Sequence, residues 1–215
     1  MEQTVDWTRS ALVIVDPQVD VLSQQSVIWD LVGEQVSQLD VVNKLVALRD
    51  QAEQSGVSVF YAWLEMSEAD YASWQPRNGL QQLMADRRMM LRGRGARFVP
   101  PLEPTAHTVL LTPRRTPSTT ATDLTLQLRQ RGLDTIVVAG MVANLCVESH
   151  VRDATDAGYR AFVVEDAIAT TDQATLDATL ADFQLTATGR LRTDAVLASL
   201  QAETTRRANT NLPAA

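Results

Sequence analysis

The 215-residue sequence has a single cysteine, Cys146, so no disulfide can form within the chain. Its first ten residues, MEQTVDWTRS, include acidic side chains and no apolar stretch, so we do not expect a secretory signal there. No apolar run reaches the roughly 20 residues that a helix needs to cross a bilayer. Together these absences predict a protein of a reducing, cytoplasmic compartment with no membrane partner.

Motifs for metals and nucleotides are also missing. The chain has two histidines, and it contains no HxxxH, no CxxC and no His–Asp cluster with metal-ligand spacing. No GxGxxG or GxxxxGK[ST] follows an apolar run, which argues against a dinucleotide or triphosphate site. The formal net charge of -7 opposes binding to a polyanion. The sequence therefore predicts no metal, no cofactor and no nucleic-acid partner.

Short apolar runs rich in β-branched residues are present, and they alternate with helical patterns. Runs that are apolar on both faces are typical of buried parallel strands. The expected strands are residues 11–15, 57–63, 108–111, 135–139 and 161–164, with a weaker candidate at 184–188. The alternation predicts a single-domain, Rossmann-like α/β fold. Its doubly wound, mainly parallel sheet of about six strands should have helices on both faces.

One domain is expected over residues 1–215, with flexible tails at about 1–8 and 204–215. The segment 66–104 interrupts the alternation because prolines and glycines are scattered through it. We expect one helical stretch within it, around residues 80–90. Long excursions of this kind often form pocket walls or subunit contacts.

Reactive or charged side chains follow three of the expected strands. Asp16 follows the first strand in VIVDPQVD, and Arg114 and Arg115 follow the third in LLTPRR. Cys146 opens a helix after the fourth strand in GMVANLCVESH. Because ligands of open parallel sheets bind beyond the carboxyl ends of the strands, we expect an acid, a guanidinium and a thiol to meet there.

Cys146 is the candidate nucleophile. A thiol in the first turn of a helix faces the positive end of the helix dipole, which lowers its pKa and favours thiolate. The alternative is an inert cysteine buried in the core. Asp16 is either a general base or a turn cap. His150 is a weaker candidate base, because a side chain one turn further along the helix points away from the strand edge.

Two stretches carry a family resemblance: ALVIVDPQVDVL, and ATDLTLQLRQRGLDTIVVAGMVANLCVESHVRDATDAGYRAFVVEDAIAT. With the spacing between them, they resemble the isochorismatase-like cysteine hydrolases over about residues 11–171. The segment ANLCVESH is the most specific part. The resemblance implies a sheet of the expected kind and an Asp–Lys–Cys triad.

The resemblance assigns the triad aspartate to Asp16 and the triad cysteine to Cys146. The lysine position falls on Arg115 when the count has no gaps, or on Arg114 if the loop shifts by one residue. The only lysine of the chain is Lys44. Arginine keeps the positive charge, but it cannot readily relay a proton because its pKa exceeds about 12. Proton transfer would then rest on Asp16 alone.

The resemblance also implies a cis peptide bond between Met141 and Val142. The N–H groups of Val142 and Cys146 would then form an oxyanion hole. Possible substrate contacts are Gln18, Arg114 and Trp63. The metal-binding amidases of the family use histidines that this sequence lacks, so the resemblance implies no metal.

These features predict a cysteine-dependent hydrolase that cleaves a small amide, carbamoyl or ureido C–N bond through a thioester. The alternative is a catalytically altered relative, with arginine in place of lysine, that binds a small molecule or a protein partner. A third hypothesis is a redox-sensing thiol. The resemblance further implies a homo-oligomer, either a dimer or a tetramer.

Overall fold

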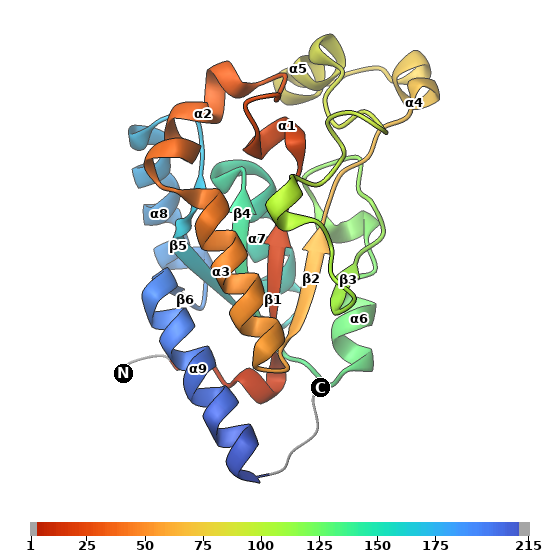
Figure 1. Ribbon diagram of the computed structural model, residues 1–215. Helices are drawn as coiled ribbons and strands as arrows, with labels where there is room; N and C mark the ends of the chain where they lie inside the picture. The colour runs from red at the N-terminus through yellow and green to blue at the C-terminus, as the bar shows by residue number, and fades with distance from the viewer. Residues whose placement is uncertain (1–3, 211–215) are drawn as a thin grey trace.

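The computed structural model describes residues 4–210, and they form an α/β fold around one sheet (Figure 1). The strands are β1 (Ser10–Val15), β2 (Ser58–Ala62), β3 (Thr108–Leu110), β4 (Thr135–Met141), β5 (Arg160–Ala169) and β6 (Gly189–Leu191). Their order across the sheet is β3-β2-β1-β4-β5-β6, and every neighbouring pair is parallel. The predicted doubly wound sheet is therefore confirmed.

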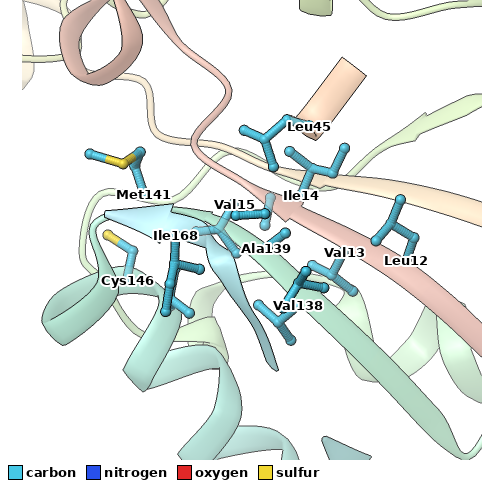
Figure 2. Close-up of a cluster of buried hydrophobic side chains, with 14 of the residues drawn as sticks. Leu12, Val13, Ile14, Val15, Leu45, Val138, Ala139, Met141, Cys146 and Ile168 are labelled. Atoms are coloured by element: carbon cyan, nitrogen blue, oxygen red, sulfur yellow. The ribbon is translucent and has the colours of Figure 1, made fainter. Parts of the chain in front are cut away.

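The central strands are buried on both faces, which explains why their sequences are apolar without a break. Every residue of β1 and of β4 is buried. The β-branched residues of SALVIV and TIVVAGM fit such a pleated, covered surface. Figure 2 shows part of this core, where side chains of β1 and β4 cluster with Ile168, Met141 and Cys146. The candidate nucleophile is thus attached directly to the rigid centre of the molecule.

Helices cover both faces of the sheet (Figure 1). On one face, α3 (Val41–Gln54) packs against α9 (Thr193–Thr210). On the other face lie α7 (Glu148–Asp156) and α8 (Gln173–Thr186), and α6 (Leu124–Gln130) connects β3 to β4. Buried residues of α3 and α7 recur every three or four positions, as expected for helices with one apolar face. Short helical turns are η1 (Trp7–Arg9), η2 (Pro100–Leu102), η3 (Thr119–Ala121) and η4 (Ala143–Val147).

The remaining helices lie beyond the carboxyl ends of the strands (Figure 1). After β1 come α1 (Val19–Leu22) and α2 (Trp29–Gln38), and the excursion after β2 carries α4 (Glu68–Ser73) and α5 (Gly79–Arg87). The side chain of Asn78 caps α5, which is the helical stretch expected around residues 80–90. A capping box formed by Ser67 and Asp70 begins α4, a helix that was not predicted.

The sixth strand lies later in the chain than predicted. Residues 184–186 are the last turn of α8, and β6 starts at Gly189, where it pairs with residues 162–164 of β5. The side chain of Asp172 caps α8, and Leu185 is 88% exposed, as suits a helix and not an inner strand. Periodicity alone cannot separate a short apolar strand from the end of a helix.

The chain ends are more ordered than predicted. Residues 204–210 continue α9, where Glu203 forms ion pairs with Arg206 and Arg207. Near the other end Trp7 is buried, and its Nε1 donates a hydrogen bond to Ser199 of α9 at 2.9 Å. The prediction of flexible tails is therefore wrong for residues 7–8 and 204–210, and its parts at residues 1–3 and 211–215 lie outside the described residues.

Candidate active site

The strand order places the candidate site between β1 and β4. The chain winds from β1 toward β3 on one side and from β4 toward β6 on the other, so a crevice opens where the two halves meet. Asp16 directly follows β1, and Cys146 lies in the turn after β4. Arg114 comes from the loop after β3, where it forms a parallel bridge with Leu64.

Asp16 and Arg114 form a buried ion pair. The carboxylate of Asp16 accepts a hydrogen bond from Nη2 of Arg114, and the two side chains are 2% and 0% exposed. Nη1 of Arg114 donates to the carbonyl oxygens of Thr116 at 3.1 Å and Pro117 at 2.9 Å. These bonds hold the guanidinium in one orientation against the carboxylate.

The surroundings of this pair set its protonation. Burial raises the pKa of Asp16 to about 6, and the charge of Arg114 and a hydrogen bond with Cys146 offset only part of that effect. Burial lowers the pKa of Arg114, but the negative charge of Asp16 opposes that effect and the pKa is raised, so the guanidinium stays protonated. A carboxylate with a pKa near 6 is mostly ionised at pH 7 and can both accept and return a proton.

Arg115 does not belong to this group, although the count without gaps placed it there. Its side chain is half exposed, and its Nε lies 3.3 Å from Oδ1 of Asp70 in α4. Consecutive side chains of an extended segment point to opposite sides, and the bridge with Leu64 turns Arg114 inward. Arg114, the alternative weighed from the sequence, therefore occupies the position between the two other groups.

Cys146 lies in the π-helical turn η4, a geometry that is frequent at functional sites. It is 6% exposed and borders a cavity. Burial and the negative charge of Asp16 raise the pKa of its thiol, and Arg114 offsets this only in part. The expectation of a ready thiolate is therefore wrong for the free protein, because desolvation and the charge of Asp16 outweigh the charge of Arg114. A redox-sensing role, which needs an exposed thiolate, loses its basis.

The backbone around η4 has two special features. The peptide bond between Met141 and Val142 is cis, at the position that the resemblance implies. Gly140 has a φ of 119°, and a Cβ there would lie 2.1 Å from the carbonyl oxygen of Val15. Only glycine allows β4 to pass so close to the end of β1. Val142 and Cys146 both border the cavity, and the oxyanion hole of their N–H groups stays a prediction.

His150 supports the backbone of the nucleophile and not its sulfur. Its Nδ1 lies 2.6 Å from the carbonyl oxygen of Cys146, and the side chain is fully buried. Burial and the charge of Arg114 lower its pKa to about 3, so the ring is neutral. Within residues 4–210, Nε2 has no hydrogen-bond partner. The Cys146–His150 nucleophile–base pair considered from the sequence is therefore not formed.

Gln18 and Trp63 also bind backbone. The fully buried amide of Gln18 donates to the carbonyl oxygens of Leu64 and Ala96, both at 2.7 Å, and accepts from the N–H of Leu64 at 2.9 Å. Nε1 of Trp63 donates to the carbonyl oxygen of Leu111 at 2.7 Å. Neither side chain borders the cavity, so the structure gives no direct substrate contact to these two predicted residues.

Asp20 is a further buried acid, and it stabilises a loop, which is one of the two roles that the sequence left open for it. Its Oδ2 accepts a hydrogen bond from the N–H of Met90 at 2.6 Å. A Cβ on Gly95 would lie 1.7 Å from the same oxygen, so the backbone there needs glycine to come so close. Asp20 therefore fastens the excursion after β2 to the segment after β1, and burial raises its pKa.

The cavity beside Cys146 has an empty volume of about 630 Å³, its open mouth included. Apart from Asp16, Cys146 and Thr171, its lining is apolar and comes mainly from α2 and the excursion. The apolar residues are Val21, Ile28, Leu31, Val32, Leu64, Leu80, Leu83, Met84, Met89, Met90, Pro117, Val142 and Leu145. The part from α2 was missed, although the spacing of Ile28, Leu31 and Val32 is that of a helix face.

Residues 4–210 contain no group of three or more His, Cys, Asp or Glu side chains that could hold a metal ion. No helix in the same range is both long and apolar enough to cross a membrane.

Comparison with protein families identifies one match over most of the chain. Residues 10–195 match the model of the Isochorismatase domain. The matched range contains β1 to β6 and all three groups of the candidate site.

Known proteins agree with this match. YwoC of Bacillus subtilis, an uncharacterized isochorismatase family protein, is 40% identical over 85 residues, which are 40% of this chain and 45% of YwoC. The chain thus matches less than half the length of the first curated relatives. Ureidoacrylate amidohydrolase RutB of Agrobacterium fabrum is 27% identical over 179 residues, 76% of this chain and 77% of RutB.

A solved structure has the same fold. The crystal structure of a cysteine hydrolase from Pseudomonas syringae pv. phaseolicola gives a TM-score of 0.76 at 21% sequence identity. The alignment covers 94% of this chain and 100% of that one. At such low identity the likeness shows the arrangement of the elements alone.

Proposed function

We propose that this chain, which belongs to the isochorismatase family of hydrolases, cleaves the C–N bond of a small amide, carbamoyl or ureido compound through a thioester on Cys146. The observation that carries the proposal is the meeting of Asp16, Arg114 and Cys146 at the end of an open cavity. The relative RutB, an amidohydrolase by name, supports the type of bond.

The first half of the reaction forms the thioester. Asp16 takes the proton of the Cys146 thiol while the sulfur attacks the carbonyl carbon of the substrate. Because the thiol is protonated in the free protein, proton removal and attack occur together. Asp16 then passes the proton to the leaving nitrogen, and its pKa of about 6 suits both transfers.

The second half releases the product. Asp16, ionised again, takes a proton from a water molecule that attacks the thioester carbonyl. The tetrahedral intermediate collapses as the C–S bond breaks, a carboxylic acid (from an amide) or a carbamic acid (from a carbamoyl or ureido compound) leaves, and the proton returns to the sulfur. In both halves the N–H groups of Val142 and Cys146 hold the oxyanion that forms on the substrate.

Arg114 acts as a fixed positive charge in this scheme. It keeps Asp16 ionised in a buried place and lowers the energy of the sulfur anion as the anion forms. Its bonds to Thr116 and Pro117 keep it in place without a proton transfer. The replacement of the family lysine by Arg114 therefore leaves Asp16 as the proton carrier.

Intact-mass spectrometry during turnover tests the proposal. The protein is mixed with a panel of amides, ureido acids and carbamoyl compounds, and ammonia release is followed. A substrate should add the mass of its acyl group to the wild-type chain, and Cys146→Ala should abolish both the adduct and the turnover. Unchanged turnover by Cys146→Ala would reject the thioester.

A catalytically altered relative is the second candidate, and the arginine at the lysine position favours it. Such a protein would bind a small molecule or a protein partner in the cavity and release no ammonia. Thermal-shift screening identifies binding without turnover. Under this hypothesis Arg114→Lys, which restores the family residue, should create an activity that the wild-type chain lacks.

A further inference from the structure

The cavity offers no cation to a charged substrate. Among the described residues that line it, Asp16 is the one charged side chain, and it is an anion. Arg114 is fully buried and does not line the cavity; its terminal nitrogens bond Asp16, Thr116 and Pro117, and its Nε has no partner among the described residues. A carboxylate in the cavity would therefore meet one negative charge and no positive partner.

Two arginines at the end of α5, Arg87 and Arg88, form ion pairs with residues that do not line the cavity. Nη2 of Arg87 lies 3.0 Å from Oδ2 of Asp30. Arg88 forms an ion pair with Glu68. These pairs engage both guanidinium groups, and neither arginine lines the cavity.

The wall itself is aliphatic and adaptable. Leu80, Leu83 and Met84 come from α5, and Met89 and Met90 follow it. Methionine side chains are unbranched and polarisable, so they adjust to apolar groups of different shape. An apolar group of a substrate would gain contacts here, whereas a carboxylate would lose its hydration without compensation.

We propose that the substrate is an uncharged primary carboxamide with a branched aliphatic or aromatic acyl group, which packs against α2 and α5. The inference rests on the proposed function for the reaction itself. Cys146 displaces ammonia from the carbonyl carbon, and water then converts the thioester to a carboxylic acid and restores the thiol. The ionised product lies beside the Asp16 carboxylate in a cavity of apolar side chains, and both disfavour a second negative charge. The features that select a neutral substrate therefore also favour release of the product.

Two compounds of equal size and different charge test the selection. 4-Methylpentanamide and succinamate have the same number of heavy atoms and differ in an isopropyl group against a carboxylate. Their affinities for the Cys146→Ala protein are measured by calorimetry, so no turnover is needed. The neutral amide should bind at least about tenfold more tightly. Equal or tighter binding of succinamate overturns the inference, and so does the absence of binding by both compounds.

A matched pair of variants locates the selection in the wall. Leu31 is 36% exposed at the cavity, and Leu185 is 88% exposed on α8 outside it. Leu31→Arg, made in the Cys146→Ala protein, should weaken the binding of 4-methylpentanamide and strengthen the binding of succinamate. Leu185→Arg adds the same charge outside the cavity and should change neither of the two affinities. Unaltered affinities in the Leu31→Arg protein count against the inference.

The binding test separates this inference from the proposed function. If the neutral amide binds preferentially but the wild-type chain forms no thioester and releases no ammonia, the substrate class stands and the hydrolase proposal fails. If the wild-type chain hydrolyses succinamate faster than 4-methylpentanamide, the hydrolase proposal stands and the substrate class fails.

Discussion

The cavity has a floor formed by Asp16 and Cys146, with Arg114 buried and paired to Asp16, and a wall of apolar side chains from α2 and the excursion of residues 66–104. Asp16, Arg114 and Cys146 follow β1, β3 and β4, whose positions are set by strand pairing. The wall lies on surface segments beyond the sheet (Figure 1). The residues proposed to react with the substrate are thus attached to the paired strands, which are the most rigid part of the fold. Groups that select a ligand lie where a family can vary them at little cost to the fold.

The two regions are joined by buried polar side chains and not by strand pairing alone. Gln18 binds the backbone of Leu64 and Ala96, and Asp20 binds that of Met90. Both residues lie just after β1, within a few positions of Asp16. The wall is therefore positioned from the same short stretch that provides the base. A buried polar group with its bonds satisfied specifies one arrangement, because any other leaves it unpaired.

The largest effect should come from removing the cation of the buried ion pair beneath the cavity. Arg114→Gln leaves the carboxylate of Asp16 buried without its partner, so the free energy of unfolding should fall by about 3–5 kcal/mol at pH 8. At pH 5 part of the loss should be recovered, because protonated Asp16 needs no cation. Urea denaturation followed by circular dichroism measures both values.

Arg115→Gln is the matched control, since it removes the same group one residue further along. The Arg115 side chain is half exposed, so its pair with Asp70 contributes little to stability. Its unfolding curve should coincide with that of the wild-type chain. A larger loss for Arg115→Gln than for Arg114→Gln would contradict the assignment of the two residues.

The pH dependence of activity should come from the floor alone. Asp16 must be ionised to accept the thiol proton, and its pKa is about 6. The value of kcat/KM should therefore rise with pH to a plateau above about 7, and well below pH 6 it should fall about tenfold per unit. Steady-state kinetics on a neutral amide measure the profile.

Binding of the same amide to the Cys146→Ala protein should change little between pH 5 and 8, because the amide is uncharged and its acyl group contacts apolar side chains. That control separates proton transfer from a change of the wall. A profile with no limb between pH 5 and 7 would show that Asp16 is not the base.

The smallest effect should come from shortening one apolar side chain of the cavity wall. Leu83→Ala removes apolar contacts to the substrate but leaves Asp16 and Cys146 untouched, so KM should rise by about tenfold while kcat changes little. Leu126→Ala, on the exposed surface of α6, is the control and should leave both constants unchanged. A large loss of kcat in Leu83→Ala would mean that floor and wall are not independent.

Much of the fold was accessible from local pattern. Apolar runs such as ALVIV and TIVVA are too continuous for half-exposed strands, so burial on both faces and a parallel sheet follow from composition. The sixth strand was misplaced because residues 184–188 carry no feature that separates a strand from a helix end. The helical end of the chain was missed because its stability comes from packing against α3.

The site, too, has residues that the local sequence predicts and one residue that only a contact between distant segments identifies. Asp16 and Cys146 could be named because each directly follows a strand, and the carboxyl ends of parallel strands share one edge. The choice between Arg114 and Arg115 depends on which side of an extended segment each faces. That is decided by the bridge to Leu64, a residue distant in sequence.

By itself, the sequence determined the alternation of strands and helices, the family resemblance and the place of an acid and a thiol after two strands. Each of these is a property of neighbouring residues or of their spacing. Only the tertiary structure decided which arginine is buried, that the free thiol is protonated, and that the cavity wall is uncharged. These depend on desolvation and on contacts between segments far apart in the chain, and no local pattern encodes how much water a group loses on folding.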